Sequence, residues 1–204
     1  MDIHLNFINY SDDTNNSSVV IFQKNVADPF DHSVIAWEVI SNYGRGVKIP
    51  FVFPFTLTLA ANDGFGNYTP RQIAQNGQIF QVVYTAGVDD ALQLTQIPGP
   101  STEVQVRNDL GLGAIDACIY RNGKLLAIWR SVLRGQVAIF EFTPTIWIGV
   151  ASEVSPGNQI SLSMVSNIYT EISLLGVKSA DIVMTGGASG GQPITFKLEN
   201  VVMA

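Results

Sequence analysis

The chain has 204 residues, of which 47% are hydrophobic and only 14% are charged, and its formal net charge is −6 at pH 7. A typical soluble domain carries about 25% charged residues, so this surface must consist largely of Asn, Gln, Ser, Thr and apolar atoms. The 11 Lys and Arg residues form no dense cluster, which argues against nucleic-acid binding. A charge-poor surface resists association weakly, which favours self-assembly or contact with a carbohydrate or lipid surface.

The N-terminal segment MDIHLNFINYSDD has neither a basic region nor a long apolar run, so it does not resemble a signal peptide. The sequence contains no uninterrupted apolar stretch of about 18 residues, so it predicts no transmembrane helix. We therefore expect a cytoplasmic protein, or one exported without a signal peptide. The single cysteine, Cys118, cannot form an intrachain disulfide, and its apolar context predicts a buried, inert thiol.

In the first third of the chain, strands are expected at 3–10, 18–25, 34–42 and 51–59. The last of these, FVFPFTLTL, alternates apolar and other residues over its whole length, which predicts one half-buried strand. Pro54 cannot donate a hydrogen bond to a neighbouring strand, so this strand should lie at an edge or contain a bulge. Residues 70–75 are a candidate for a single helical turn.

The middle of the chain contains the clearest turn signal. Strands are expected at 78–85, 91–97 and 102–108, followed by AIDACIYR and KLLAIWRS on either side of Asn122-Gly123. An Asn-Gly pair between two apolar, β-rich runs predicts a tight hairpin, because both turn residues need a positive φ. The runs QVAIFEF, TIWIGVA and QISLSMV follow at a spacing of about ten residues, as in sandwiches and barrels.

Further strands are expected at 168–175, 180–184 and 193–201. The pattern as a whole predicts an all-β fold, an antiparallel β-sandwich of two packed sheets, with Greek-key and jelly-roll arrangements as variants. We expect a single domain over 1–204. The alternative is two tandem halves, 1–97 and 101–204, separated at QIPGP (96–100).

The string MTGGASGG (184–191) is similar to the phosphate-binding loop of dinucleotide-binding enzymes. That loop must open a helix, because the pyrophosphate sits on a helix N-terminus. Here Gln192 stands at a position that needs glycine, Pro193 follows, and the next residues alternate in part like a strand. We expect a flexible connection between two strands and no nucleotide cofactor.

The loop NDGFGN (62–67) is the best candidate for a cation site. Asn62, Asp63 and Asn67 offer hard oxygen ligands of the kind that calcium prefers, and the two glycines permit sharp bends. The loop has only one carboxylate, whereas calcium sites usually have several, and a simple strand connection is the alternative. Asp89 and Asp90 would add charge if the fold brought them near.

Aromatic residues near turns are candidates for stacking on a sugar ring or entering a lipid interface. The ligand-binding candidates of this kind are Tyr68, Phe65, Tyr43 and Trp147. Tyr84 also lies near a turn. Trp147 lies within a strand pattern, where a tryptophan more often belongs to the core.

No catalytic residues are assigned, and the chain is expected not to be an enzyme. His4, His32 and Cys118 are too far apart in the sequence to give a zinc-binding spacing. A hydrolase would need two carboxylates facing each other across a cleft, for which Glu38, Glu141 and Glu171 are the candidates.

These observations leave three hypotheses in order. The first is a non-catalytic, self-associating structural protein that forms a homo-oligomer or polymer. The second is a carbohydrate- or lipid-binding module, with a pore-forming variant in which 157–175 enters a membrane as an amphipathic hairpin. The third is a hydrolase with paired carboxylates.

Overall fold

The computed structural model describes residues 2–13, 17–28, 33–64, 66–85, 88–161, 169–187 and 191–204. These residues form β-strands joined by turns and loops and contain no helix, which confirms the all-β prediction. Accordingly, no helix with the length and apolar character needed to cross a membrane occurs in these segments.

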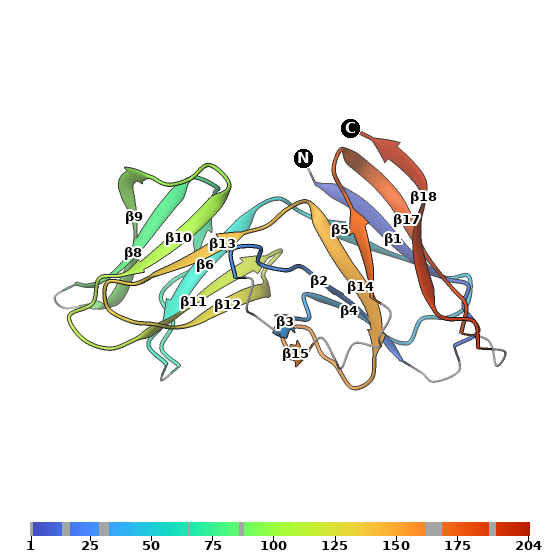
Figure 1. Cartoon of the computed structure of the whole chain (residues 1–204), viewed down its shortest axis with the longest axis horizontal. Coiled ribbons are helices and arrows are strands. Elements are labelled where there is room, and N and C mark those ends of the chain that lie inside the picture. Colours follow the sequence, from blue (N-terminus) through green and yellow to red (C-terminus); the bar gives the residue numbers. More distant parts are fainter. Residues whose placement is uncertain are drawn as a thin grey trace. The chain divides into compact units, whose positions relative to one another are not determined.

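The chain forms two compact units, whose strands are labelled in Figure 1. Unit 1 comprises 1–24, 32–55 and 144–204, and unit 2 comprises 25–31 and 56–143. The segment 96–100, a candidate linker from the sequence, lies inside unit 2, where it ends one strand and turns into the next. The expectation that the chain folds as a single domain stays a prediction, because a compact unit need not unfold independently.

Unit 1 contains two four-stranded sheets. Sheet 1 has the order β18-β17-β1-β5 and sheet 2 has the order β16-β14-β2-β4. The strands of sheet 1 are β1 (Ile3–Asn9), β5 (Lys48–Phe53), β17 (Val177–Thr185) and β18 (Thr195–Met203). Those of sheet 2 are β2 (Ser18–Phe22), β4 (Glu38–Ile40), β14 (Thr145–Ala151) and β16 (Thr170–Ser173). A short pair, β3 (Ser33–Ile35) and β15 (Gln159–Ser161), completes the unit.

The core of unit 1 follows from two different sequence patterns. In β1 the alternating Ile3, Leu5 and Phe7 are buried, as expected for a strand with one face toward a core. The run VVIF in β2 is buried throughout. Phe22 belongs to a separate apolar cluster with Val34, from β3, and with residues of β14 and β15, so both faces of β2 are covered.

Unit 2 also contains two four-stranded sheets, sheet 3 (β12-β11-β6-β7) and sheet 4 (β13-β10-β8-β9). Sheet 3 is formed by β6 (Leu57–Asn62), β7 (Gln72–Ala74), β11 (Ile115–Arg121) and β12 (Lys124–Val132). Sheet 4 is formed by β8 (Gln78–Thr85), β9 (Val88–Pro98), β10 (Glu103–Asn108) and β13 (Val137–Glu141). Leu59 and Ile119 of sheet 3 and Phe80, Val106 and Phe140 of sheet 4 are fully buried and belong to the core.

The sandwich prediction is confirmed, with one refinement. Most strand pairs are antiparallel, but β1 pairs with β17 in parallel, and β8 pairs with β10 in parallel. Each unit thus contains a parallel pair that an antiparallel pattern does not include. The predicted Asn-Gly hairpin is also confirmed, since it joins β11 to β12 with φ of 52° at Asn122 and 72° at Gly123.

Two local predictions are wrong. The run 51–59 is not one strand: β5 ends at Phe53 and β6 begins at Leu57, in different units. Pro54 lies at the break, where its missing N–H and fixed φ interrupt strand pairing. Residues 72–74 form strand β7 instead of a helical turn, because pairing with β6 overrides the local preference.

The glycine-rich string connects two strands, as predicted: β17 ends at Thr185 and the next element is β18, not a helix. Gly186 has a φ of 89°, and a Cβ there would lie 2.0 Å from the carbonyl oxygen of Pro193, so only glycine fits. The expected hairpin at 157–175 is not formed by its described strands, because β15 pairs with β3 and β16 pairs with β14. Residues 162–168 lie outside the described residues.

Candidate functional site

Unit 2 has a pocket of about 520 Å³ that contains the predicted cation loop. Its apolar wall comes from Ala61, Val82 and Ile115, on β6, β8 and β11. The polar wall comes from the 62–67 loop and from Asp90 on β9. Two sheets therefore contribute to one cavity, with an apolar side and an oxygen-rich side.

The loop that forms the polar wall is held by its own hydrogen bonds. The Asn67 amide donates to an Asp63 carboxylate oxygen at 2.8 Å, and the Gly64 N–H donates to Asn62 Oδ1 at 2.7 Å. A β-bridge joins Asn62 to Tyr68, and the Ala61 N–H donates to Thr69 Oγ1 at 3.0 Å. The loop is a closed turn that already uses part of the oxygen set expected to bind calcium.

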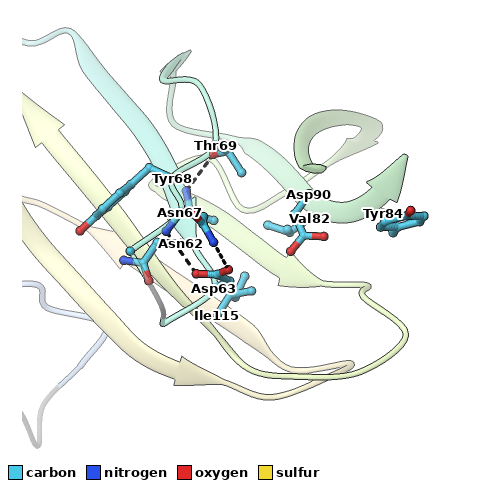
Figure 2. Close-up of a pocket in the computed structure, with 11 residues that line it drawn as sticks. Asn62, Asp63, Asn67, Tyr68, Thr69, Val82, Tyr84, Asp90 and Ile115 are labelled. Carbon is cyan, nitrogen blue, oxygen red and sulfur yellow. Dashed lines mark hydrogen bonds between the residues drawn. The ribbon is translucent and has the colours of Figure 1, made fainter. Parts of the chain in front are cut away.

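Two tyrosines and two carboxylates give the pocket its chemistry. In the view of Figure 2, the carboxylates of Asp63 and Asp90 lie between the rings of Tyr68 and Tyr84. Tyr68 is 58% exposed and Tyr84 is 70% exposed. None of the described residues that line the pocket is basic, so the pocket suits neutral or cationic ligands better than anions.

The structure brings some of the predicted site residues together. Asn62, Asp63, Asn67 and Tyr68 line one pocket, and the fold brings Asp90 to them. Phe65 lies outside the described residues. No group of three or more His, Cys, Asp or Glu side chains suited to a metal gathers in the part of the chain that is described. Calcium binding at this loop stays a prediction.

Tyr43 and Trp147 belong to unit 1 and are not among the residues that line this pocket. The Tyr43 ring packs edge-on against Phe7 with ring centroids 5.3 Å apart. Burial, followed by the charge of Asp13, raises the pKa of the Tyr43 hydroxyl to about 12. Trp147 is only 8% exposed and stacks on Phe22, with the Lys24 ammonium 4.9 Å from its ring centroid. Both side chains have packing roles in unit 1.

The structure also places three residues that were considered for metal binding or catalysis, namely Cys118, Glu38 and Glu171. Cys118 is buried in a small cluster with Ala60 and Tyr120, and burial raises the pKa of its thiol to about 11, as expected for an inert thiol. Glu38 and Glu171 lie on β4 and β16, the opposite edges of sheet 2. The backbones of these two strands are three strand spacings apart, which is about 14 Å. Paired glycosidase carboxylates are roughly 5 to 9.5 Å apart.

A second candidate site is the edge strand β18 of sheet 1, shown beside β17 in Figure 1. The Tyr10 N–H bonds the Met184 carbonyl at 2.8 Å, so the backbone groups of Met184 point toward β1. Because these groups alternate along a strand, those of Asp181, Val183 and Thr185 point toward β18.

The partners of those residues on β18 are Glu199, Lys197 and Thr195. Their backbone groups therefore bond to β17, whereas those of Phe196 and Leu198 point away from the sheet. An edge of this kind is a template for another strand. Exposed apolar side chains follow it, with Val202 at 50% and Met203 at 61%.

The opposite edge of sheet 1, strand β5, is interrupted by a proline. By the same alternation, Ile49, Phe51 and Phe53 bond to β1, and the backbone groups of Lys48, Pro50 and Val52 point outward, with Pro50 at the centre. Pro50 has no N–H to offer, which is a common protection of edge strands.

Asp181 connects both edges of sheet 1. Its carboxylate accepts hydrogen bonds from Asn6 at 2.7 Å and Asn200 at 2.8 Å, and from Lys48 of β5 at 3.1 Å. The Asn200 hydrogen bond is the largest cause that holds the pKa of Asp181 below its usual value of 3.8, with Asn6 and Lys48 contributing and burial opposing. Asn200 has a φ of 50° and lies at a bulge in β18, so this network fixes the shape of that edge.

Sequence reasoning identified the loop of the pocket but not the edge or Asp181. The sequence shows Asp90 and Tyr84 as a charged and an aromatic residue near turns. It contains no signal that these residues lie beside the 62–67 loop. The edge position of β18 depends on strand order, for which the sequence has no local signal.

The fold and these two sites define a two-unit, all-β sandwich protein. Comparisons of the chain with models of known protein families, with curated proteins and with solved structures find no match. Its function must therefore be argued from its own residues.

Proposed function

We propose that this chain is a non-catalytic, self-associating β-sandwich protein, and that β18 is the surface through which copies join. The observation that carries the proposal is the outer edge of β18, where the backbone groups of Phe196 and Leu198 point away from sheet 1. An unpaired edge gains main-chain hydrogen bonds when a second strand adds to it.

The composition supports the same function. Only 14% of the residues are charged, so electrostatic repulsion between copies is weak. Val201, Val202 and Met203 expose apolar surface along the end of β18, and Leu175 is 73% exposed in unit 1. Burial of such surface favours association by about 25 cal/mol per Å².

The experiment is the solution mass of the full chain, measured by light scattering after size exclusion from micromolar to high micromolar concentration. Self-association predicts a mass above 22.1 kDa that rises with concentration. A mass of one chain at every concentration would contradict the proposal.

A second candidate function is carbohydrate binding at the pocket of unit 2. The observation that favours it is the combination of an apolar wall, two exposed tyrosines and the oxygens of Asp63 and Asp90 in one cavity. Sugar rings have an apolar face that stacks on aromatic rings and hydroxyls that donate to carboxylates. The absence of basic lining residues favours neutral sugars over phosphates or sulfates.

A panel of neutral mono- and disaccharides, titrated by calorimetry with and without calcium, tests this second function. Tyr84→Ala should weaken binding of a sugar about fivefold, since stacking on an exposed ring contributes on the order of 1 kcal/mol. Tyr10→Ala, an exposed tyrosine of unit 1, is the matched control. Equal affinities for both variants would count against the pocket as the sugar site.

A further inference from the structure

We infer that two copies of the chain join as a closed dimer, by antiparallel pairing of their β18 strands about a two-fold axis at Leu198, so that Lys197 of each copy faces Glu199 of the other. The inference rests on the self-association proposed above and names its partner, register and symmetry. It is built from the direction of the backbone groups, the charges on the edge, and the state of the opposite edge of sheet 1.

The backbone restricts the registers that are allowed. On the outer edge of β18, Phe196 and Leu198 present their N–H and C=O groups, whereas Lys197 and Glu199 use theirs in bonds to β17. In an antiparallel pair, outward-facing residues must stand opposite outward-facing residues. The two-fold axis must therefore place one residue opposite the same residue of the other copy. An axis that places a residue opposite its chain neighbour is excluded, because it would pair an outward-facing residue with an inward-facing one.

Charge selects among these registers. An axis at Lys197 places the two Lys197 side chains opposite each other, and an axis at Glu199 does the same for Glu199. Like charges directly opposite on a sheet are destabilising, whereas opposite charges are stabilising. An axis at Leu198 places Lys197 opposite Glu199 twice, once on each side of the axis.

An axis at Phe196 is less favourable for a different reason. It places Lys197 opposite Thr195 and gains no ion pair. It also places Glu199 opposite residue 193, which precedes the start of β18 at Thr195. The register at Leu198 is therefore the one that combines strand overlap with charge complementarity.

The side chains are oriented to make these pairs. Lys197 and Glu199 are exposed, whereas the side chain of Phe196, on the opposite face of the strand, is buried, with 3% of its surface exposed. A two-fold axis perpendicular to the sheet keeps each face on its own side, so both ion pairs lie on the solvent face. They occupy positions that exchange no backbone bonds, where opposing Cα atoms are about 4.5 Å apart and side chains are closest.

The same geometry limits the assembly to two chains. In a two-fold interface each copy uses the same edge, so pairing consumes both β18 edges. Growth of sheet 1 at its other end would require β5, where Pro50 faces outward. A closed dimer follows, rather than an open polymer.

The experiment is sedimentation analysis of the full chain and of charge-exchanged variants. Lys197→Glu and Glu199→Lys each turn two attractive contacts into two repulsive ones, so each should weaken dimerisation by about tenfold or more. The double variant K197E/E199K restores both pairs with the composition and net charge of the original chain, and should dimerise like it. Each variant's thermal unfolding at low concentration checks that the monomer fold is kept.

A mixing experiment gives the sharpest result. Combining K197E chains with E199K chains recreates both attractive pairs across the two-fold axis, so the mixture should form a heterodimer even though each variant alone is weak. If the original chain dimerises but the single variants dimerise equally well, the register at Leu198 is wrong while self-association stands. If the double variant and the mixture stay as weak as the single variants, this register is also overturned. A monomeric original chain would overturn both proposals.

Discussion

The two edges of sheet 1 belong to one sheet and differ in one property. On β5, the central one of three outward-facing positions is Pro50, which has no N–H, whereas on β18 the outward-facing residues Phe196 and Leu198 both have an N–H. A single carboxylate, Asp181, is hydrogen-bonded to Lys48 of β5 and to Asn200 of β18. Among the described residues, one end of the sheet is interrupted by a proline, and the other end has N–H groups that no strand of the sheet uses.

The largest effect is expected from making the edge of β18 resemble that of β5. Leu198→Pro removes the outward N–H at the centre of the proposed pairing without removing a bond to β17, so dimerisation should be lost. Leu198→Ala, which truncates the same side chain but keeps the N–H, is the matched control and should still dimerise. Light scattering of both variants makes the measurement, and equal masses would show that the edge N–H has no part in association.

The next effect concerns the network that holds the two edges in shape. Asp181→Ala removes the acceptor for Asn6, Asn200 and Lys48 and should lower the free energy of unfolding by about 2–3 kcal/mol. Denaturant titration makes the measurement, with the exposed Asp2→Ala as the control. A loss no larger than that of the control would contradict the structural role of Asp181.

The same titration tests the domain organisation. Trp37 and Trp147 report on unit 1, and Trp129 reports on unit 2. One shared transition would agree with the single domain expected from the sequence. Separate transitions, with only that of unit 1 shifted by Asp181→Ala, would indicate two domains.

The pH dependence of stability follows from the same carboxyl group. Because the pKa of Asp181 is lower in the folded chain than its usual value of 3.8, its charged form favours folding. This contribution is complete above the usual pKa and is lost as the pH falls through the lower, folded-state pKa. Unfolding curves between pH 7 and pH 2 should show less acid destabilisation for Asp181→Asn than for the original chain, and parallel curves would rule out this linkage.

The smallest effect is expected from replacing the proline that interrupts β5. Pro50→Val supplies an outward N–H on β5, so some dimers should add further copies and the average mass should rise modestly above that of a dimer. The double variant P50V/L198P, with an uninterrupted row of outward N–H groups only on β5, should not exceed a dimer. A mass unchanged by Pro50→Val would mean that other features, such as the exposed Lys48, also protect β5.

The sequence predicted the positions of the strands better than it predicted which strands pair with each other. Alternation and turn chemistry located β1, β8 and the Asn122-Gly123 hairpin, because these signals are local. The run 51–59 failed because its alternation continues through Pro54 although the chain changes unit there. Periodicity describes a strand but carries no information about which sheet receives it.

The candidate sites divide in the same way. The 62–67 loop could be recognised because its ligand atoms lie close together in the sequence, and the structure places these residues on one pocket wall. Asp90 joined them only through the pairing of β9 with β8. The outer edge of β18 and the contacts of Asp181 depend on strand order, which is set by the packing of the whole unit.

Hydrogen exchange at single amides of β18, measured at high and low protein concentration, tests the central claim most directly. The amides of Lys197 and Glu199 bond within sheet 1 and serve as internal controls that stay protected at both concentrations. The account predicts that the amides of Phe196 and Leu198 are protected at high concentration and exchange rapidly on dilution. Rapid exchange of both amides at a concentration where the chain is dimeric would contradict β18 as the edge through which the copies join.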